Sequence, residues 1–265
     1  MTIGLIVVGD EILSGKRRNK HLARVIELLG ARGLALAWAR FVGDDRARIV
    51  QVLREAFGGG DIVFCCGGIG ATPDDHTRQA AAQALGVPLE LHPQARALIA
   101  ERMRDVAAEK GLPFEPERAD NRHRLNMGCF PRGAEIIPNP YNKIPGFSVG
   151  DVHFVPGFPV MAWPMIEALL DSRYRPLHGQ GASRERSVVV YGSMEATLTP
   201  LMERIEAAHA GIRVFSLPCV DAGHRFGRHI ELGVKGPPAV VDAAFAELQH
   251  GLGALQLRLG PELVR

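Results

Sequence analysis

The sequence has 265 residues, 46% of them hydrophobic, which is enough to bury one large core or one core and a smaller second one. Its 31 basic and 29 acidic residues give a net charge of +2, so neither a nucleic acid nor a membrane surface is expected as a partner. Four cysteines without Cys-x-x-Cys spacing, and no apolar run of the ~20 residues that a membrane span needs, favour a cytoplasmic protein without disulfides.

Strand and helix patterns alternate through the first two thirds of the sequence. Apolar runs predict buried strands at 2–8, 34–42, 61–64 and 151–155. Apolar residues at helical spacing predict helices at about 22–29, 49–56, 79–85, 93–108 and 161–170. The polar segment 110–121 is expected to be an excursion over the surface, and the segment 138–147, rich in proline and glycine, a fixed, non-regular loop. This repetition predicts an α/β fold with a doubly wound, mostly parallel sheet.

The last third of the sequence has a different order of elements. After a linker-like segment at 174–184, the patterns predict strands at 187–191, 212–217, 229–234 and 255–259, with helices after Ser193 and at 238–252. The order β-α-β-β-α-β is typical of a small ferredoxin-like α/β domain. We therefore expect two domains, 1–175 and 176–265.

A glycine-rich segment lies between the strand that ends at Phe64 and an alanine-rich helix. It reads Gly67-Gly68-Ile69-Gly70-Ala71-Thr72. A tight loop between a strand and a helix directs backbone N–H groups and the positive end of a helix dipole at one point, which is a site for phosphate. We expect the amides of Gly68, Ile69 and Gly70 to hold it. Capping is an alternative for part of the motif, with Thr72 as N-cap, Pro73 at the first helical position and Asp75 at the third.

The glycine segment is followed by two adjacent carboxylates, Asp74 and Asp75. They would repel a phosphate unless a divalent cation lay between them, and Mg²⁺ is commonly held by one or two carboxylates plus phosphate. We therefore expect Mg²⁺ or Mn²⁺, with Asp74, Asp75 and Asp44 as metal ligands. Asp10, Asp74, Asp75 and His76 are the candidate catalytic groups, although a histidine at a helix start can also be merely solvated. Alternatively, the acids accept hydrogen bonds from the edge of a pterin or guanine.

Further residues are expected to bind the ligand. Lys20, Lys143 or Arg78 could neutralise charge that develops in a transition state, although a lone lysine is more often a surface residue. The turn at 156–159 repeats the strand–loop–helix arrangement on a later strand, and two such turns facing one crevice would form a pocket. Met161 and Met165 are interpreted as core residues. The candidate ligand-binding residues are Gly67, Gly68, Ile69, Gly70, Ala71, Thr72, Thr77, Lys20, Asn139, Lys143, Pro145, Gly146, Pro156 and Gly157.

Four blocks of the sequence resemble the molybdopterin-binding (MoCF) domain, in the form found in the competence-damage-inducible CinA family. They are Gly-Asp-Glu-Ile-Leu-Ser-Gly at 9–15, the glycine segment with Asp-Asp-His-Thr-Arg at 67–78, the loop 139–147, and Val-Pro-Gly-Phe-Pro at 155–159. The last part of the chain also resembles the small α/β domain of CinA proteins, through Gly-Ser-Met-Glu at 192–195 and Glu-Leu-Gly-Val-Lys-Gly at 231–236.

The resemblance implies a MoCF-type fold that binds molybdopterin or an adenine nucleotide. In CinA proteins it also implies a metal-dependent pyrophosphatase that acts on ADP-ribose, and a homo-oligomer. The alternative is a module that binds the phosphorylated ligand without turning it over. The sequence has no room for the C-terminal deamidase domain of many CinA proteins, so deamidation is not expected. The family's Asp-Thr-Asn is replaced by 18–21, Arg-Asn-Lys-His, so Lys20 and His21 could face the ligand and change its identity.

Overall fold

The computed structural model describes residues 2–179 and 184–264. The chain divides into two compact units, Met1–His178 and Gly179–Arg265, which are described separately. Among the residues that the structure describes, no helix combines the length and the apolar character that crossing a membrane requires.

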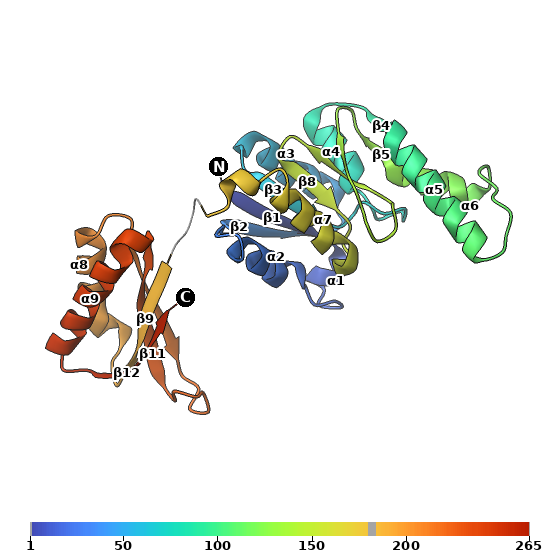
Figure 1. Ribbon diagram of the computed structural model, residues 1–265. Coiled ribbons are helices and arrows are strands. Elements are labelled where there is room, and N and C mark those ends of the chain that lie inside the picture. The colour runs from blue at the N-terminus through green and yellow to red at the C-terminus, as the bar shows by residue number, and fades with distance from the viewer. Residues whose placement is uncertain (1, 180–183, 265) are drawn as a thin grey trace. The chain divides into compact units, whose positions relative to one another are not determined.

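The first unit is built on a six-stranded sheet (Figure 1). Its order is β2 (Trp38–Val42), β1 (Ile3–Val8), β3 (Ile62–Cys66), β8 (Val152–Val155), β7 (Gly146–Val149) and β6 (Glu135–Ile137). The first four strands are parallel and the last two are antiparallel to their neighbours. The expected doubly wound, mostly parallel sheet is thereby confirmed.

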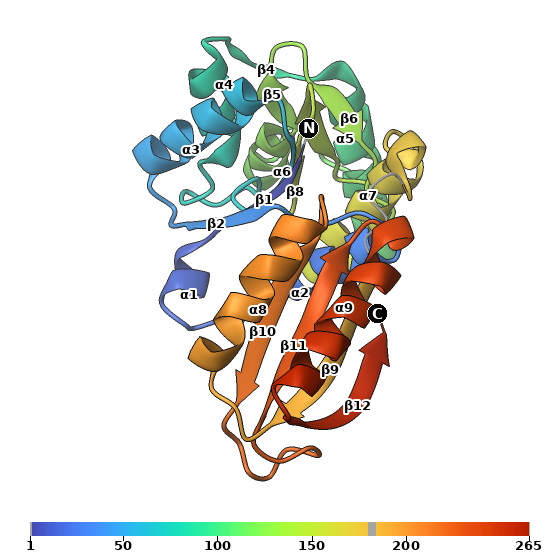
Figure 2. The ribbon, with the colours of Figure 1, turned by 90° about the vertical axis from the view of Figure 1, so that its left-hand side faces the viewer.

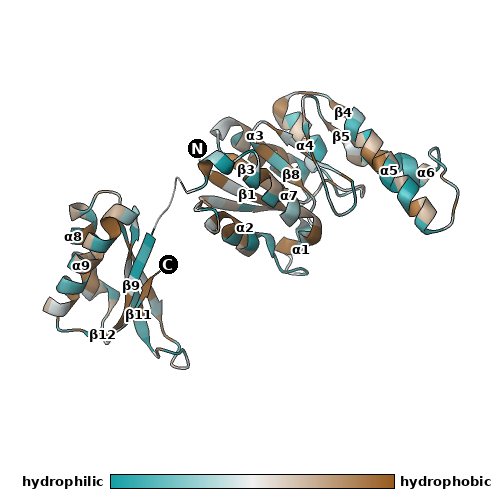
Figure 3. Ribbon diagram, viewed as in Figure 1, coloured by the Kyte–Doolittle hydropathy of each residue, from teal (hydrophilic) through white to brown (hydrophobic). Residues whose placement is uncertain are grey.

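Helices cover both faces of this sheet because its central strands are apolar on both sides (Figure 3). Residues of α2 (His21–Gly30) and α7 (Pro159–Asp171) pack on Leu5 and Val7 of β1. Residues of α3 (Arg46–Gly59) and α4 (Thr77–Leu85) pack on Ile6 and Val8. Successive residues of a strand point to opposite faces, so β1 serves both cores.

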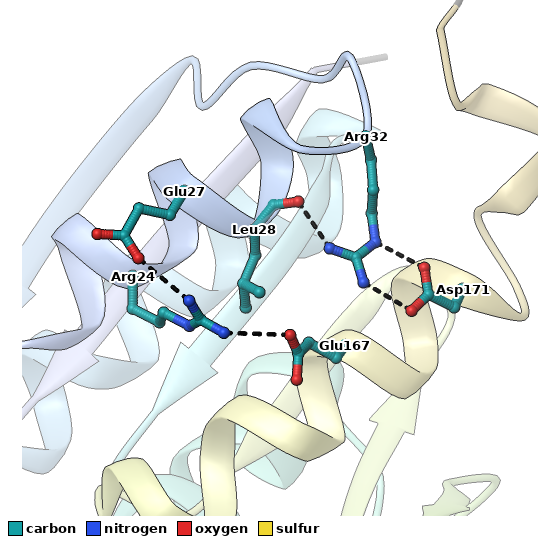
Figure 4. A network of polar contacts seen from close by, with 6 residues as sticks. All are labelled: Arg24, Glu27, Leu28, Arg32, Glu167 and Asp171. Atoms are coloured by element: carbon teal, nitrogen blue, oxygen red, sulfur yellow. Dashed lines mark hydrogen bonds and ion pairs between the residues drawn. The ribbon is translucent and has the colours of Figure 1, made fainter.

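Ion pairs fix α2 against α7 (Figure 4). Arg32 donates through Nε and Nη2 to the two carboxylate oxygens of Asp171, each at 2.6 Å, and through Nη1 to the Leu28 carbonyl at 2.8 Å. Arg24 bridges Glu27 and Glu167 at 3.1 and 3.2 Å. Both helices begin at the carboxyl edge of the sheet, whereas Asp171 ends α7 and Arg32 follows the end of α2, so this pair joins the helices at the ends away from that edge.

An excursion leaves the sheet between α4 and β6. It contains a two-stranded sheet of β4 (Leu89–Leu91) and β5 (Cys129–Pro131), and the helices α5 (Pro93–Glu109), α6 (Ala119–Leu125) and the single turn η1 (Asn126–Gly128). The segment 110–121, expected to run over the surface, is exposed from 110 to 119 and enters α6 at Ala119. The residue that this helix buries is the polar Asn121, which donates from Nδ2 to the Glu115 carbonyl at 2.7 Å. The helix therefore has no apolar periodicity by which the sequence could have predicted it.

Other boundaries also differ from the sequence-based ones. A short helix, α1 (Asp10–Leu13), follows β1 directly. The second strand begins at Trp38, not at residue 34, because the Leu34 amide still donates to the Leu29 carbonyl at the end of α2. The segment 138–147, expected to be irregular throughout, enters β7 at Gly146. After α7, a single turn, η2 (Arg175–Leu177), closes the unit.

The second unit is an antiparallel four-stranded sheet with two helices on one face (Figure 2). Its elements are β9 (Arg184–Tyr191), α8 (Glu195–Ala208), β10 (Arg213–Cys219), β11 (His229–Gly236), α9 (Pro238–Ala254) and β12 (Arg258–Val264). The sheet order β10-β11-β9-β12 is that of a ferredoxin-like sandwich, as expected. The last strand runs over 258–264, later than 255–259, because α9 extends to Ala254.

Candidate functional site

The two glycine turns predicted from the sequence lie against each other. They follow β3 and β8, which are neighbouring parallel strands with Cys66 opposite Val155. The amide of Gly67 donates to the Val155 carbonyl at 3.0 Å. A Cβ on Gly157 would lie 3.4 Å from the Cα of Gly67. The turns therefore meet at the carboxyl edge of the sheet, where open α/β sheets bind ligands.

A cavity of about 690 Å³ opens at this edge. Most of the residues expected to form the site line it: Asp44, Gly67, Gly68, Ile69, Gly70, Ala71, Thr72, Asp74, Asp75, Asn139, Pro145, Pro156 and Gly157. It is also lined by side chains that the sequence analysis did not assign to it: Glu11, Lys16, Arg17, Met127, Asn142, Phe158 and Met161.

Two positions of the loop accept only glycine. Gly67 has φ +107°, and a Cβ there would lie 2.3 Å from the Val8 carbonyl oxygen. Gly68 has φ +69°, and a Cβ there would lie 2.2 Å from Oγ1 of Thr77. The loop thus passes close to β1 and to the start of α4 in a backbone conformation that side chains disfavour.

Buried polar side chains hold the loop from behind. Thr77 donates from Oγ1 to the Gly67 carbonyl at 3.0 Å and from its amide to the Gly68 carbonyl at 2.9 Å. Arg78 is 3% exposed and donates from Nη2 to the Gly70 carbonyl at 2.6 Å. Both residues therefore position the loop and do not line the cavity, so the ligand role considered for them finds no support in this geometry.

The front of the loop leaves its donors free. Within residues 2–179 and 184–264, the amides of Gly68, Ile69 and Gly70 donate to no protein acceptor. Ile69 is buried and both flanking glycines are half-buried. Backbone amides at this depth normally have a partner, and consecutive unpaired amides facing a cavity form an anion-binding concavity.

The capping interpretation of Thr72, Pro73 and Asp75 was wrong. Helix α4 begins at Thr77, with His76 in the N-cap position. The amide and hydroxyl of Thr72 instead donate to the same carboxylate oxygen of Asp75, at 2.8 and 2.5 Å. Asp75 therefore closes a turn ahead of the helix, while a hydrogen bond from the Thr72 side chain lowers the pKa of Asp74.

Asp74 belongs to a group of acids that come from three loops. A pocket beside the cavity is lined by Asp10, Glu11, Asp44 and Asp74. The amide of Asp10 donates to Oδ2 of Asp44 at 2.9 Å, and the amide of Asp44 donates to Oδ1 of Asp10 at 3.1 Å. Burial raises the pKa of Asp44, the bond from the Asp10 amide opposes this, and the charges of Asp10, Glu11 and Asp74 raise it further.

The donor set of this acidic pocket suits a hard divalent cation. Carboxylate oxygens are the ligands that Mg²⁺ and Mn²⁺ prefer. Among the described residues, however, no three carboxylate side chains each bring an oxygen within 4.8 Å of the other two. Mg²⁺ usually takes one or two carboxylates and completes its shell with water and substrate phosphate. Asp44 and Asp74, which line both the pocket and the cavity, fit that mode.

Several predicted residues lie away from the cavity lining. Lys143 is held at 2.6 Å from both Glu101 and Asp105, and these two bonds raise its pKa. Gly146 lies in β7, and His76 and Lys20 are the N-cap residues of α4 and α2. The basic run is nevertheless represented in the cavity, because Lys16 and Arg17 line it in place of Lys20.

His21 does not face the ligand cavity. It is 4% exposed, and its Nε2 donates to the Gly157 carbonyl at 2.9 Å. Burial lowers the pKa of His21, while this hydrogen bond raises it. The neutral ring thus fixes the turn after β8. Met161, interpreted from sequence as core, lines the cavity instead, with its sulfur 3.5 Å from Nδ2 of Asn142.

Comparison with known proteins agrees with this geometry. The family model described as "Probable molybdopterin binding domain" matches residues 4–176. A CinA-like protein of Anaeromyxobacter sp. (strain Fw109-5) is 32% identical over 272 residues, which cover 96% of this chain and 63% of the relative. A protein of Pyrobaculum arsenaticum is 32% identical over 222 residues, 81% of this chain and 78% of the relative.

A solved structure is similar to part of this chain. The CinA protein of Thermoplasma acidophilum superposes with a TM-score of 0.53 at 28% identity, over 64% of this chain and 96% of that one. The resemblance to the CinA-type MoCF domain that four sequence blocks indicated is confirmed. The chain spans 51–64% of the length of the CinA-like relatives compared with it.

Proposed function

The chain belongs to the family of molybdopterin-binding domains, and on that premise we propose that its first unit binds a phosphorylated adenine nucleotide or pterin and hydrolyses a phosphoanhydride with a divalent cation. One observation carries the proposal. The unpaired amides of Gly68, Ile69 and Gly70 share a cavity with the carboxylates of Asp44 and Asp74. Donors for a phosphate and oxygen ligands for a cation thus line the same space.

Each part of the lining has a task in this reaction. The loop amides bind the phosphate oxygens, and the side chains of Lys16 and Arg17 offset the remaining negative charge. Asp44 and Asp74 would hold the cation. When bound, Mg²⁺ or Mn²⁺ would supply Lewis-acid polarisation of the phosphate. Water adds to one phosphorus, the bridging oxygen leaves with the other phosphate, and the two protons of the water pass to solvent or stay on the two phosphomonoester products.

The raised pKa of Asp44 supports the assignment of a cation to this place. Three neighbouring carboxylates destabilise its charge, and a divalent cation would reverse that effect. The reciprocal bonds with Asp10 use one oxygen of each carboxylate and leave the other for the cation.

A binding module without turnover is the second candidate. It is favoured by the lack of three converging carboxylates among the described residues, since one weakly held cation can neutralise a ligand without activating water. In this version the acids accept hydrogen bonds from a heterocycle edge. A homo-oligomer, which the family resemblance implies, stays a prediction that a mass measurement in solution can test.

The test is cleavage of ADP-ribose by the full chain with Mg²⁺ and with Mn²⁺. Native protein should release AMP only with the cation. Asp44→Asn and Asp74→Asn should each lower the rate by about 100-fold or more, which corresponds to ~2.7 kcal/mol of transition-state stabilisation. Asp120→Asn is the matched control, because this exposed carboxylate pairs with Arg118 in the excursion.

The outcomes separate the two candidates. Tight, cation-dependent binding of ADP-ribose without AMP release would refute hydrolysis and support the binding module. Equal AMP release from native protein, Asp44→Asn and Asp74→Asn would place the chemistry elsewhere and refute the assignment of the acidic pocket.

A further inference from the structure

Three metal-ligating side chains meet in the second unit, away from the acidic pocket. β10 ends at Cys219 and β11 begins at His229, and these two residues are opposite each other in the antiparallel register. Directly opposite residues have Cβ atoms about 4.5–5.5 Å apart and point to the same face of the sheet. The loop between the strands brings His224 over His229, with ring centroids 4.9 Å apart.

The spacing of the donor atoms suits a transition metal. One ligand atom from each of Cys219, His224 and His229 lies within 4.8 Å of the other two. In a tetrahedral zinc site, bonds of ~2.0–2.3 Å put ligand atoms about 3.3–3.7 Å apart. Among the described residues, this is the one group of three or more Cys, His, Asp or Glu side chains whose ligand atoms all lie within 4.8 Å of one another. Small side-chain rotations would close the remaining distance.

One nitrogen of the His229 ring is engaged by the backbone, which leaves the other for a metal. Its Nδ1 lies 2.7 Å from the Gly227 carbonyl oxygen, which can only accept, so Nδ1 carries the proton. The lone pair of Nε2 is then free for a metal. Metal-ligating histidines almost always donate their other ring N–H in this way to a carbonyl or carboxylate. His229 is 9% exposed, so protein atoms support this orientation.

The other two side chains would lose only weak contacts on binding a metal. The thiol of Cys219 makes only a 3.9 Å contact with the Asp221 carbonyl, and Nδ1 of His224 accepts a long 3.3 Å bond from the Phe226 amide, within the described residues. Cys219 is half-buried and His224 is exposed, so solvent reaches the cluster and can supply a water molecule as fourth ligand.

We propose that Cys219, His224 and His229 bind one Zn²⁺ ion, with water in the fourth position. A thiolate with two imidazoles is a donor set for zinc and not for Mg²⁺, so this site is distinct from the one formed by Asp44 and Asp74. The ion joins the two strand ends to the loop and closes the β10–β11 hairpin. The sequence pattern is Cys-x₄-His-x₄-His, with no Cys-x-x-Cys pair.

The test is Co²⁺ titration of the full chain after removal of metal by a chelator. One equivalent should bind with the visible bands of tetrahedral cobalt and a near-ultraviolet thiolate-to-metal band, and Zn²⁺ should displace it; Co²⁺ bound by the carboxylates of Asp44 and Asp74 would add no thiolate band. Cys219→Ser should abolish the thiolate band and weaken binding by more than the ~10–100-fold that loss of a second-shell partner costs. His224→Ala, at an exposed position, tests the site without disturbing a packed strand.

Matched variants locate the bound ion. Cys129→Ser removes a half-buried cysteine of the first unit and should leave the titration unchanged. The proposal is overturned if native protein gives no thiolate band, or if Cys219→Ser and His224→Ala bind Co²⁺ as tightly as native protein does.

Discussion

Asp10 and Asp44 each accept a hydrogen bond from the other's backbone amide, at 3.1 and 2.9 Å respectively. This reciprocal pair joins the segment after β1 to the segment after β2, although the two residues are 34 positions apart. Gly43 makes the approach possible, because a Cβ there would lie 2.4 Å from Oδ1 of Asp10. The geometry of the acidic pocket therefore depends on a residue that carries no charge.

The first prediction concerns that glycine. Gly43→Ala should force Asp10 away and break its bonds with Asp44, at a cost below the about 1–3 kcal/mol of overpacking a core, because the contact is the end of an exposed side chain. Cation-dependent ligand binding should weaken with it. The control is Gly58→Ala, since a Cβ on this α3 residue meets nothing within 4 Å and should stabilise the helix by about 0.5–1 kcal/mol. Urea denaturation of both variants measures the difference, and equal stabilities would contradict it.

The second prediction separates backbone strain from steric contact. Gly68 and Gly86 both have φ +69°, but only at Gly68 would a Cβ meet another atom closely, at 2.2 Å from Oγ1 of Thr77. Alanine at either position should cost about 1–2 kcal/mol for the left-handed backbone. Gly68→Ala should cost more and abolish ADP-ribose binding, whereas Gly86→Ala should bind normally. Calorimetric titration checks binding; intact affinity in Gly68→Ala would exclude the loop from the site.

The third prediction assigns the basic side chains. Lys16→Ala and Arg17→Ala should each weaken ADP-ribose binding by roughly 10–100-fold, because a charge-assisted contact is worth about 1.5–3 kcal/mol. Lys20→Ala and Lys143→Ala should have little effect, since neither side chain lines the cavity. Dissociation constants at one fixed ionic strength measure all four. A larger effect at Lys20 than at Lys16 would reverse the assignment.

The fourth prediction is a pH dependence that comes from a buried cluster. His153 accepts at Nδ1 from Ser148 and donates from Nε2 to Tyr174, whose hydroxyl donates to Asp151. Burial and the charge of Arg173 lower the pKa of His153 to about 4, while Asp151 opposes the shift. The folded state therefore resists protonation below pH 6.5, where the unfolded chain takes up the proton.

The contribution of His153 to the free energy of unfolding of the first unit should accordingly be fully present above pH 6.5 and be lost between pH 6.5 and about 4. The share from His153 is at most about 3 kcal/mol. His153→Gln should remove that share of the slope while leaving the share from carboxylates. Both tryptophans, Trp38 and Trp163, lie in the first unit, so their fluorescence in urea reports on it alone. An identical slope in the variant would contradict the assignment.

Local sequence was sufficient for the parts of the site that lie on one turn. The strand, glycine and helix patterns around Gly67 and Gly157 predicted both turns, and the parallel sheet brings them together. The local sequence could not distinguish the surroundings of Asp74 from those of Asp75. The difference arises because Asp75 accepts a hydrogen bond from the Thr72 amide, whereas Asp74 lines a pocket with acids of two other segments.

The local sequence pattern could not predict contacts between residues that are far apart in the sequence either. The basic run suggested Lys20, but the chain turns at α1 so that Lys16 and Arg17 reach the cavity. The pairing of Cys219 with His229 depends on strand register, which neither strand specifies by itself.

The most direct test of the central claim is a crystal structure of the full chain with ADP-ribose and Mn²⁺, whose anomalous scattering locates the metal. The account predicts phosphate oxygens within about 3.2 Å of the amides of Gly68, Ile69 and Gly70. It also predicts the Mn²⁺ peak beside the carboxylates of Asp44 and Asp74. A ligand bound elsewhere, or a metal peak away from both acids while the phosphate occupies the loop, would contradict the account.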